Sequence, residues 1–395
     1  EALELEPENL DVQAKIATVN YAEQKKEAAE NAIDKILIRD PEHRQSNFLK
    51  GRLLFDNQNY SGALSYFNKV LAIYPGDLPS KFFKAQCLLD KGKSDLPGQG
   101  LFRVAAGYTS EESWERKLAQ DELLSILNSD PQFRPARIVL IQTLLDDSET
   151  QKARQHLGYL LARNKNDFEA LALAGRVMII EEKYDGAEKI YRELVGQRPE
   201  YTDGYINLGR IYHALKDRDK AIEMLDKALS IQPAHMEAFN TKISLLMLAK
   251  LKEQALVECD QHRTAFKHED PALAIIDLIQ GRIHLTTGEP AKAEIYFSQA
   301  LEKIPDLTGA HEQLAQLYSN RKDYGPAKKH YEKLIEIKPE YLPSYIKLAL
   351  IHQAEDKLNK AKAVLRKALE INRNYAPAAN NMAYLIVETN GSLYE

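Results

Sequence analysis

The fold is decided by a stretch near the middle of the chain, residues 205–233, which reads YINLGRIYHALKDRDKAIEMLDKALSIQP. It holds large apolar residues at Tyr205, Leu208, Tyr212 and Leu225, small residues at Gly209, Ala221 and Ala228, and Pro233 at its end. A small residue is needed where two helices cross closely, because a larger Cβ atom would hold the backbones apart. The aromatic and leucine positions fill the space between neighbouring helices. Proline closes the second helix and turns the chain onward.

The same pattern recurs along the chain at a fixed step of about 34 residues. From Ala119 this step reaches Ala153, Ala187, Ala221 and Ala255, and it also joins Ala29 to Ala63 and Ala293 to Ala327 and Ala361. The prolines keep the same register at Pro41 and Pro75, at Pro199 and Pro233, and at Pro305 and Pro339. Amphipathic helices in an ordinary bundle would not hold such a step, so the period indicates a repeat architecture of helix pairs.

Two further copies repeat the full set of positions. One contains Leu171, Ala174, Gly175, Met178, Ala187, Tyr191, Leu194 and Pro199, and the other Leu314, Ala315, Tyr318, Ala327, Tyr331, Leu334 and Pro339. Together with the first stretch they resemble the tetratricopeptide repeat family, in about ten registered copies over nearly the whole chain. The resemblance implies an all-α fold, a right-handed α-solenoid, or superhelix, of about ten to eleven helix-turn-helix repeats.

Two departures from the step predict local changes. The distance from Ala63 to Ala119 exceeds one step by more than half a repeat, so we expect an inserted loop near residues 92–110, where Pro97-Gly98-Gln99-Gly100 breaks any helix. The distance from Ala255 to Ala293 exceeds one step by the length of a single helical turn. We expect the second helix of that repeat to run one turn longer, to Asp270-Pro271.

The register also predicts the domain organisation. Residues 1–9 correspond to the end of a truncated repeat, and residues 10–395 to a single superhelical array whose last repeat, 376–395, is truncated. Solenoids need polar capping elements, and neither end has the sequence of one. We therefore expect a fragment of a longer protein, and self-association through the uncapped ends is an open alternative.

Composition and motifs exclude several classes of function. The net charge is −5 without a basic block, which argues against nucleic-acid binding. No apolar run reaches the ~18–20 residues of a membrane span. The ten histidines and two cysteines show neither a His-Glu-x-x-His nor a Cys-x-x-Cys spacing. We therefore expect no metal, no cofactor and no enzyme activity.

In the family, first helices line a concave groove that holds protein or peptide partners. Before about residue 185 the groove positions are strongly apolar, and we take as candidate contacts Phe48, Phe55, Phe82, Phe83, Ile138 and Leu173. Further along they become polar, beginning with Asn207. An exposed apolar surface of this kind would bind a peptide or an amphipathic helix. The alternative is that these side chains are part of the core.

A second candidate feature is a row of arginines that directly follow the small glycine, at Arg52, Arg176, Arg210 and Arg282. Guanidinium groups recognise carboxylates well, so the row could contact an acidic partner. The alternative is that each arginine pairs with an acidic neighbour in the adjacent repeat.

The leading hypothesis is a scaffold or adaptor that binds a partner protein or peptide in the concave groove. The alternative is a structural spacer or self-assembling module. The segment Asn380-Asn381-Met382-Ala383-Tyr384-Leu385, followed by Asn390-Gly391, is similar to repeats of bacterial proteins of polysaccharide export, sorting or secretion. The bacterial envelope or periplasm and the cytoplasm both remain open as compartments.

Overall fold

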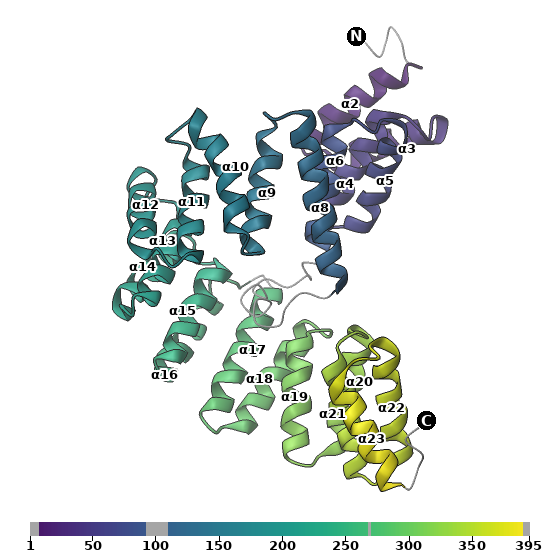
Figure 1. Cartoon of the computed structure of the whole chain (residues 1–395), viewed down its shortest axis with the longest axis vertical. Helices are drawn as coiled ribbons and strands as arrows, with labels where there is room; N and C mark the ends of the chain where they lie inside the picture. Colours follow the sequence, from purple (N-terminus) through teal and green to yellow (C-terminus); the bar gives the residue numbers. More distant parts are fainter. Residues whose placement is uncertain (1–7, 92–109, 268–269, 390–395) are drawn as a thin grey trace. The chain divides into compact units, whose positions relative to one another are not determined.

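The computed structural model describes residues 8–91, 110–267 and 270–389. All regular elements in these ranges are α-helices, which confirms the all-α helix-pair fold (Figure 1). Most of the inserted segment, residues 92–109, and the terminal residues 1–7 and 390–395 lie outside the described ranges. The chain divides into two compact units, an N-terminal unit of residues 1–224 and a C-terminal unit of residues 225–395, and each is described by itself.

The N-terminal unit consists of helices that pack against one another in chain order (Figure 1). Its helices are α2 (Leu10–Ala22), α3 (Lys26–Arg39), α4 (Arg44–Asp56), α5 (Tyr60–Ile73), α6 (Leu78–Lys91), α8 (Ser110–Ser129), α9 (Arg134–Asp146), α10 (Thr150–Arg163), α11 (Phe168–Ile180), α12 (Tyr184–Gln197) and α13 (Thr202–Ala214). Helix α14 (Arg218–Ile231) contains the boundary between the two units.

The C-terminal unit continues the same alternation of first and second helices. Its helices are α15 (Met236–Leu248), α16 (Lys252–Arg263), α17 (Asp270–Thr286), α18 (Pro290–Lys303), α19 (Thr308–Asn320), α20 (Tyr324–Ile337), α21 (Leu342–Ala354), α22 (Leu358–Ile371) and α23 (Ala376–Glu388). The final helix, α23, is a first helix and packs on α22 and α21.

The turn inside a helix pair has one recurring geometry. One residue adopts the left-handed conformation, as Glu182 does with a φ of 58°. The next amide then donates to the carbonyl five residues earlier, as Lys183 does to Met178 at 2.8 Å. This is the Schellman closure of a helix, and it reverses the chain within three residues. The same conformation recurs at Gln24, Gln58, Ser148, Lys216, Lys250, Gly288, Lys322 and Asp356.

The small residue of a first helix faces a large side chain of the second helix, always at the same spacing along the chain. A Cβ atom on Gly51 would lie 2.7 Å from Cε1 of Phe67, and one on Gly175 would lie 2.7 Å from Cε2 of Tyr191. Both aromatic rings are fully buried. The small residue is therefore required by the packing of the pair, as the sequence predicts.

A second recurring contact joins the first helix to the loop before it. Side chains of four chemical types donate to the carbonyl oxygen of a proline six residues earlier: Asn47 to Pro41 (2.8 Å), Arg137 to Pro131 (2.7 Å), His311 to Pro305 (2.8 Å) and Tyr345 to Pro339 (2.8 Å). Buried backbone carbonyls need a donor. In these four repeats a side-chain N–H or O–H group satisfies the carbonyl, whereas Phe239, six residues after Pro233, has no donor to offer.

Successive repeats are also joined by ion pairs between residues 27 positions apart. Arg154 of α10 donates to Glu181 at 2.8 Å, and Lys328 of α20 donates to Glu355 at 2.6 Å. Glu294 and Arg321 form the same pair with the charges reversed, at 2.5 Å. Either order of charges satisfies the geometry, which explains why the repeat shows no fixed charge at these positions.

The prediction for the long step between Ala255 and Ala293 was wrong. Helix α16 ends at Arg263, and the extra residues instead lengthen the next first helix, α17, which begins at Asp270. Pro271 lies in the first turn of α17, where its missing N–H costs nothing. In a helix that continued from α16, the same proline would remove a hydrogen bond.

Candidate protein-interaction surfaces

Three of the phenylalanines predicted to line the groove pack against one another in the N-terminal unit. The ring of Phe83 lies 5.9 Å from that of Phe48, 5.6 Å from that of Phe55 and 5.8 Å from that of the buried Phe67. Phe48, Phe55 and Phe83 are themselves half-buried. They therefore hold α4, α5 and α6 together, and only part of the surface of each ring is accessible to a ligand.

The other apolar candidates differ in their exposure. Phe82 is half-buried, with its ring 5.5 Å from Phe83 and 5.7 Å from Phe133. Ile138 and Leu173 are only 6% and 4% exposed and belong to the core around α9 and α11. The expectation that these two side chains present a surface is not met, because neighbouring helices cover them.

The arginine row does not present free guanidinium groups. The guanidinium of Arg52 lies 4.0 Å from the ring centre of Phe83 and donates to the hydroxyl of Tyr21 at 3.0 Å. Arg176 donates to Asp146 of the preceding repeat at 3.0 Å. For Arg176 the structure thus shows the pairing with an acidic neighbour that was the alternative.

The polar groove residue Asn207 and the other two arginines of the row also have contacts within the chain. Asn207 is buried and donates to the carbonyl of Asp203 on its own helix at 2.9 Å. Arg210 is half-buried, with one guanidinium nitrogen 3.5 Å from the side-chain oxygen of Asn207. Burial lowers the pKa of Arg282, although the nearby Glu312 acts in the opposite direction.

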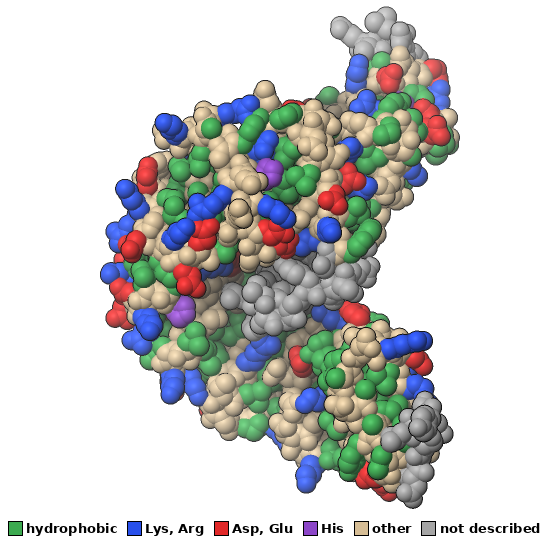
Figure 2. All heavy atoms as spheres, viewed as in Figure 1, with side chains coloured by type: hydrophobic (Ala, Val, Ile, Leu, Met, Phe, Trp, Pro, Cys, Tyr) green, Lys and Arg blue, Asp and Glu red, His purple; other side chains and the backbone are tan. Residues whose placement is uncertain are grey.

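Other apolar side chains of first helices are exposed in both units, for example Val19 of α2 in the N-terminal unit, which is 54% exposed, and several in the C-terminal unit. Leu350 of α21 is 43% exposed, and Tyr384 and Val387 of α23 are 57% and 60% exposed. Figure 2 shows hydrophobic side chains over α21 and α23 on the face in view. We call Leu350, Tyr384 and Val387 the C-terminal apolar patch.

The C-terminal apolar patch is not among the predicted groove residues, although the sequence contains a signal for it. The position that directly follows the small residue holds arginine in four repeats. The repeat step taken forward from Arg282 reaches Gln316, Leu350 and Tyr384. The register of the arginines, continued to the end of the chain, therefore contains two of the three exposed residues, Leu350 and Tyr384.

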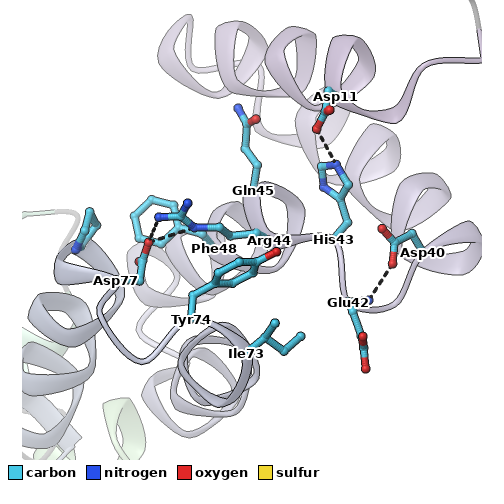
Figure 3. Close-up of a pocket in the computed structure, with 11 residues that line it drawn as sticks. Asp11, Asp40, Glu42, His43, Arg44, Gln45, Phe48, Ile73, Tyr74 and Asp77 are labelled. Carbon is cyan, nitrogen blue, oxygen red and sulfur yellow. Dashed lines mark hydrogen bonds and ion pairs between the residues drawn. The ribbon is translucent and has the colours of Figure 1, made fainter.

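The N-terminal unit also contains a hollow of about 700 Å³ at the ends of α2, α4 and α6 (Figure 3). Its lining includes Tyr74 and Ile73, which are 42% and 43% exposed. Arg44 donates to Asp77 at 3.0 Å, and its guanidinium lies 5.0 Å from the ring centre of Tyr74.

The carboxylate of Asp77 has a structural role in this hollow. It accepts a hydrogen bond from the amide of Ser80 at 2.9 Å and so caps α6. Burial alone would raise the pKa of Asp77, but the hydrogen bonds from Ser80 and Arg44 outweigh burial and lower it. Asp77 is therefore held as an anion by its own cap.

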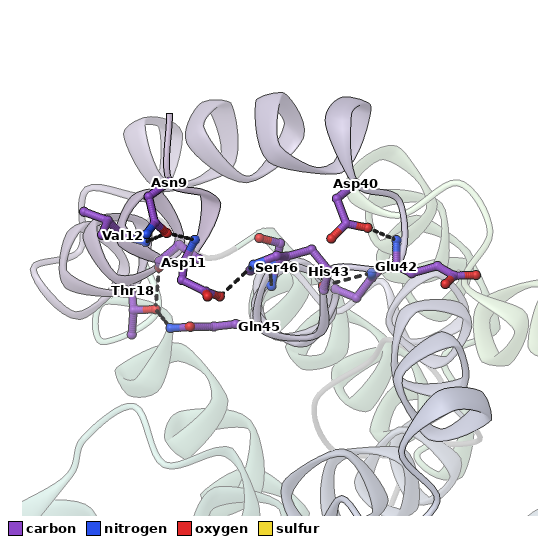
Figure 4. Close-up of polar contacts among 11 residues, drawn as sticks. Asn9, Asp11, Val12, Thr18, Asp40, Glu42, His43, Gln45 and Ser46 are labelled. Atoms are coloured by element: carbon purple, nitrogen blue, oxygen red, sulfur yellow. Dashed lines mark hydrogen bonds and ion pairs between the residues drawn. The ribbon is translucent and has the colours of Figure 1, made fainter. Parts of the chain in front are cut away.

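The other polar residues of the hollow are used in the same way (Figure 4). Nδ1 of His43 accepts from the amide of Ser46 at 3.3 Å, so Nε2 carries the proton and donates to Asp11 at 3.1 Å. Asp40 accepts from the amide of Glu42 at 3.0 Å. These groups close helix ends, and their arrangement explains the shape of the hollow without a ligand.

The two cysteines are unpaired and fully buried. Burial raises the pKa of Cys87 and of Cys259 to about 12, which keeps both as thiols at neutral pH. In the described ranges no group of three or more His, Cys, Asp or Glu side chains is placed to hold a metal ion. None of the described helices has the length and apolar character needed to cross a membrane.

Comparison with known proteins agrees with this architecture. Family profiles described as tetratricopeptide repeats match residues 15–77, 138–201, 178–246, 308–341 and 342–375. Human protein O-mannosyl-transferase TMTC1 is 30% identical over 152 residues, which cover 37% of this chain and 17% of that protein. The bovine BBSome complex member BBS4 is 24% identical over 216 residues, which cover 47% of this chain and 41% of that protein.

The chain spans less than half the length of these relatives. Among solved structures, a tetratricopeptide repeat protein from Parabacteroides merdae is similar with a TM-score of 0.56 and 11% identity, covering 70% of this chain and 98% of that one. This likeness concerns the fold alone. The matched repeats, the small residues at the helix crossings and the helix-pair architecture show that the chain belongs to the tetratricopeptide repeat family.

Proposed function

We propose that this chain is a scaffold that binds a partner protein or peptide on the concave face formed by its first helices. A repeat array presents an extended surface, which suits it to protein–protein interaction in general. The observation that carries the proposal is the C-terminal apolar patch of Leu350, Tyr384 and Val387 on two successive first helices. Exposed apolar side chains gathered on one surface mark sites of association.

The surroundings of the patch indicate what would bind. Lys347 and Asn380 are exposed beside it on the same two helices. A partner would therefore place apolar side chains on Leu350, Tyr384 and Val387 and hydrogen-bond to a polar rim. An amphipathic helix or a short apolar peptide has this chemistry. In the N-terminal unit, Phe82, Arg176 and Arg210 are half-buried and would contribute smaller contacts.

We further propose that the chain acts by binding and not by catalysis. The relative named as a mannosyl-transferase matches over only 17% of its own length, and two compact units of stacked helix pairs account for the matched repeats. Its transferase activity is a property of that protein.

Self-association is a second candidate function, and one observation favours it. Ala383 occupies the small-residue position of α23 and is exposed, whereas the corresponding Gly175 and Ala315 are buried under their second helices. Among the described helices none packs on this face of α23, and a second copy would cover it in a spacer or a self-assembling envelope module. Light scattering over a range of concentrations distinguishes the candidates, because a constant monomer mass would exclude self-association.

The scaffold proposal is tested by partner capture with matched variants. Leu350→Glu/Tyr384→Glu places charges in the patch. Ile295→Glu/Val257→Glu places the same charges on second helices, at side chains that are 57% and 52% exposed. Since all four positions are exposed, both variants should remain folded, which circular dichroism checks.

We expect a protein retained by the native chain and by the control variant to be lost with the patch variant. The captured partner should then bind the purified native chain in a direct titration, and the patch variant should bind at least about tenfold more weakly. Equal retention by both variants would contradict the proposal that the patch is the binding surface.

A further inference from the structure

The C-terminal unit contains two histidines whose rings form a hydrogen bond with each other. Nδ1 of His311 on α19 lies 2.8 Å from Nδ1 of His330 on α20. His311 is 7% exposed, and His330 is half-buried. The pair joins the two helices of one repeat.

The protonation state of the pair follows from its other contacts. Nε2 of His311 lies 2.8 Å from the carbonyl oxygen of Pro305, so this nitrogen must carry a proton. Nδ1 of a neutral His311 is then an acceptor, and His330 must donate from its own Nδ1. The neutral pair therefore has one defined arrangement of protons.

Added protons would disturb this arrangement in two steps. A proton on Nε2 of His330 would place a positive charge in a half-buried site beside His311. A second proton, on Nδ1 of His311, would set two N–H groups against each other at 2.8 Å and drive the rings apart. The first proton thus leaves the hydrogen bond between the rings in place but charges a half-buried site, and the second proton removes the bond.

The neighbouring groups do not offset these charges strongly. The ring of Tyr318 lies parallel to that of His330, with 5.8 Å between ring centres, and its hydroxyl donates to Glu294 of α18 at 2.8 Å. Glu294 is in turn paired with Arg321. Near His311, Asp306 and Lys333 act in opposite directions and are bonded to each other at 3.2 Å.

We propose that the α19–α20 repeat is a proton-sensitive element. The neutral His311–His330 pair holds the two helices packed together, which is the closed form, and mild acid separates them, which gives the open form. This opening is independent of the identity of any partner. It places a pH-controlled step next to α21, the helix that carries Leu350.

The direction of the effect follows from linkage. Burial lowers the pKa of both rings from the ordinary value of 6.5, to about 4 for His330. Because the closed form binds fewer protons than the opened form, its stability is full above the ordinary histidine pKa and falls as the pH drops below that value. If both rings stay neutral when closed and titrate normally when open, opening becomes about a hundredfold more favourable between pH 7.5 and pH 5.5.

Hydrogen exchange read by mass spectrometry tests this locally. Protection factors of α19 and α20, corrected for the intrinsic pH dependence of exchange, would be compared at about pH 7.5 and pH 5.5. We expect protection to fall by up to about a hundredfold in the native chain. His156 and His352 also have pKa values lowered by burial, so a local probe is needed in place of global unfolding.

The chain itself supplies two control variants without the titratable pair. Both variants use the residues that other repeats have at the corresponding two positions. The first, His311→Asn/His330→Tyr, copies Asn47 and Tyr66. The second, His311→Tyr/His330→Val, copies Tyr345 and Val364. Asn47 and Tyr345 each donate to the proline carbonyl as His311 does, so that contact should survive. The second variant serves if the first does not fold.

We expect the exchange protection of α19 and α20 to lose most of its pH dependence in either variant, although both variants still contain His352. An equal fall in protection in the native chain and in the variants would overturn the proposal. So would nitrogen chemical shifts showing both rings of the folded chain protonated at about pH 5.5 with exchange protection unchanged.

Discussion

The absence of a side chain at Gly175 makes room for the ring of Tyr191, since a Cβ atom would lie 2.7 Å from Cε2 of that ring. The hydroxyl of Tyr191 donates to the carbonyl of Ala172 at 2.8 Å, which fixes the ring against α11. The ring is fully buried and cannot move into solvent. Close crossing of α11 and α12 therefore depends on this pair of residues.

Replacing this glycine should destabilise the fold by overpacking. We expect Gly175→Ala to lower the free energy of unfolding by ~1–3 kcal/mol, and Gly209→Leu, at the corresponding position, by at least as much. Gly158 on α10 is an exposed helix glycine beside open space, so Gly158→Ala should instead stabilise by ~0.5–1 kcal/mol. Urea unfolding of the three variants tests this, and an unchanged midpoint for Gly175→Ala would refute the packing argument.

The turn of the α17–α18 pair makes a second prediction. Gly288 has a φ of 76°, whereas the corresponding turn residues in the other described pairs, such as Lys322 at 60°, are not glycine. Gly288→Ala should cost about 1 kcal/mol, because alanine in the left-handed region is strained. The unfolding midpoint in urea measures it. No loss of stability would mean that the turn tolerates alanine as it tolerates lysine.

The irregular repeat contains a buried carboxylate whose removal should be costly. The carboxylate of Asp277 is fully buried. It forms an ion pair with Arg263 and accepts a hydrogen bond from Lys303 at 2.8 Å. Asp277→Ala should lower the free energy of unfolding by about 3 kcal/mol or more, because it leaves two cations without their partner. Glu336→Gln removes an exposed ion pair with Lys333 and should change stability by less than ~1 kcal/mol. Similar losses in both variants would show that the burial of Asp277 is unimportant.

Acid stability should depend on the ion pairs between repeats. Hydrogen bonds from Arg154 and Lys183 lower the pKa of Glu181 from 4.5 to about 2. Since the folded-state pKa is depressed, the stabilisation is present above about pH 4.5 and is lost as the pH falls toward 2. Arg154→Gln should make the free energy of unfolding fall less steeply across this range. Identical pH profiles for the native chain and the variant would exclude the contribution of this pair.

The repeat register and the helix crossings could be predicted from residues alone, because both depend on contacts between residues a fixed number of positions apart. Gly175 and Tyr191 have the same separation along the chain as Gly51 and Phe67, and at each of these glycines even the Cβ atom of an alanine would lie 2.7 Å from the ring. The length of α17 could not be predicted in this way. Its start at Asp270 depends on the competition between two helices for the residues around Pro271.

The candidate surface shows the same division. Ile138, Leu173 and Leu350 are all apolar residues of first helices, yet the first two are buried and the third is 43% exposed. Nothing in their local sequence distinguishes them, because exposure depends on which side chains of neighbouring repeats lie above each one. The His311–His330 pair is likewise invisible in a repeat pattern whose corresponding residues elsewhere are Asn47 and Tyr66.

The sequence by itself determined that this protein is an array of helix pairs in a repeating register, and which small residues lie at the crossings, because these features arise from contacts local to one repeat. Only the tertiary structure decided which apolar side chains remain at the surface, which arginines are already paired and which two histidines share a proton. Those outcomes depend on contacts between helices of different repeats or on side-chain geometry within one repeat, and the periodic pattern of residues does not encode them.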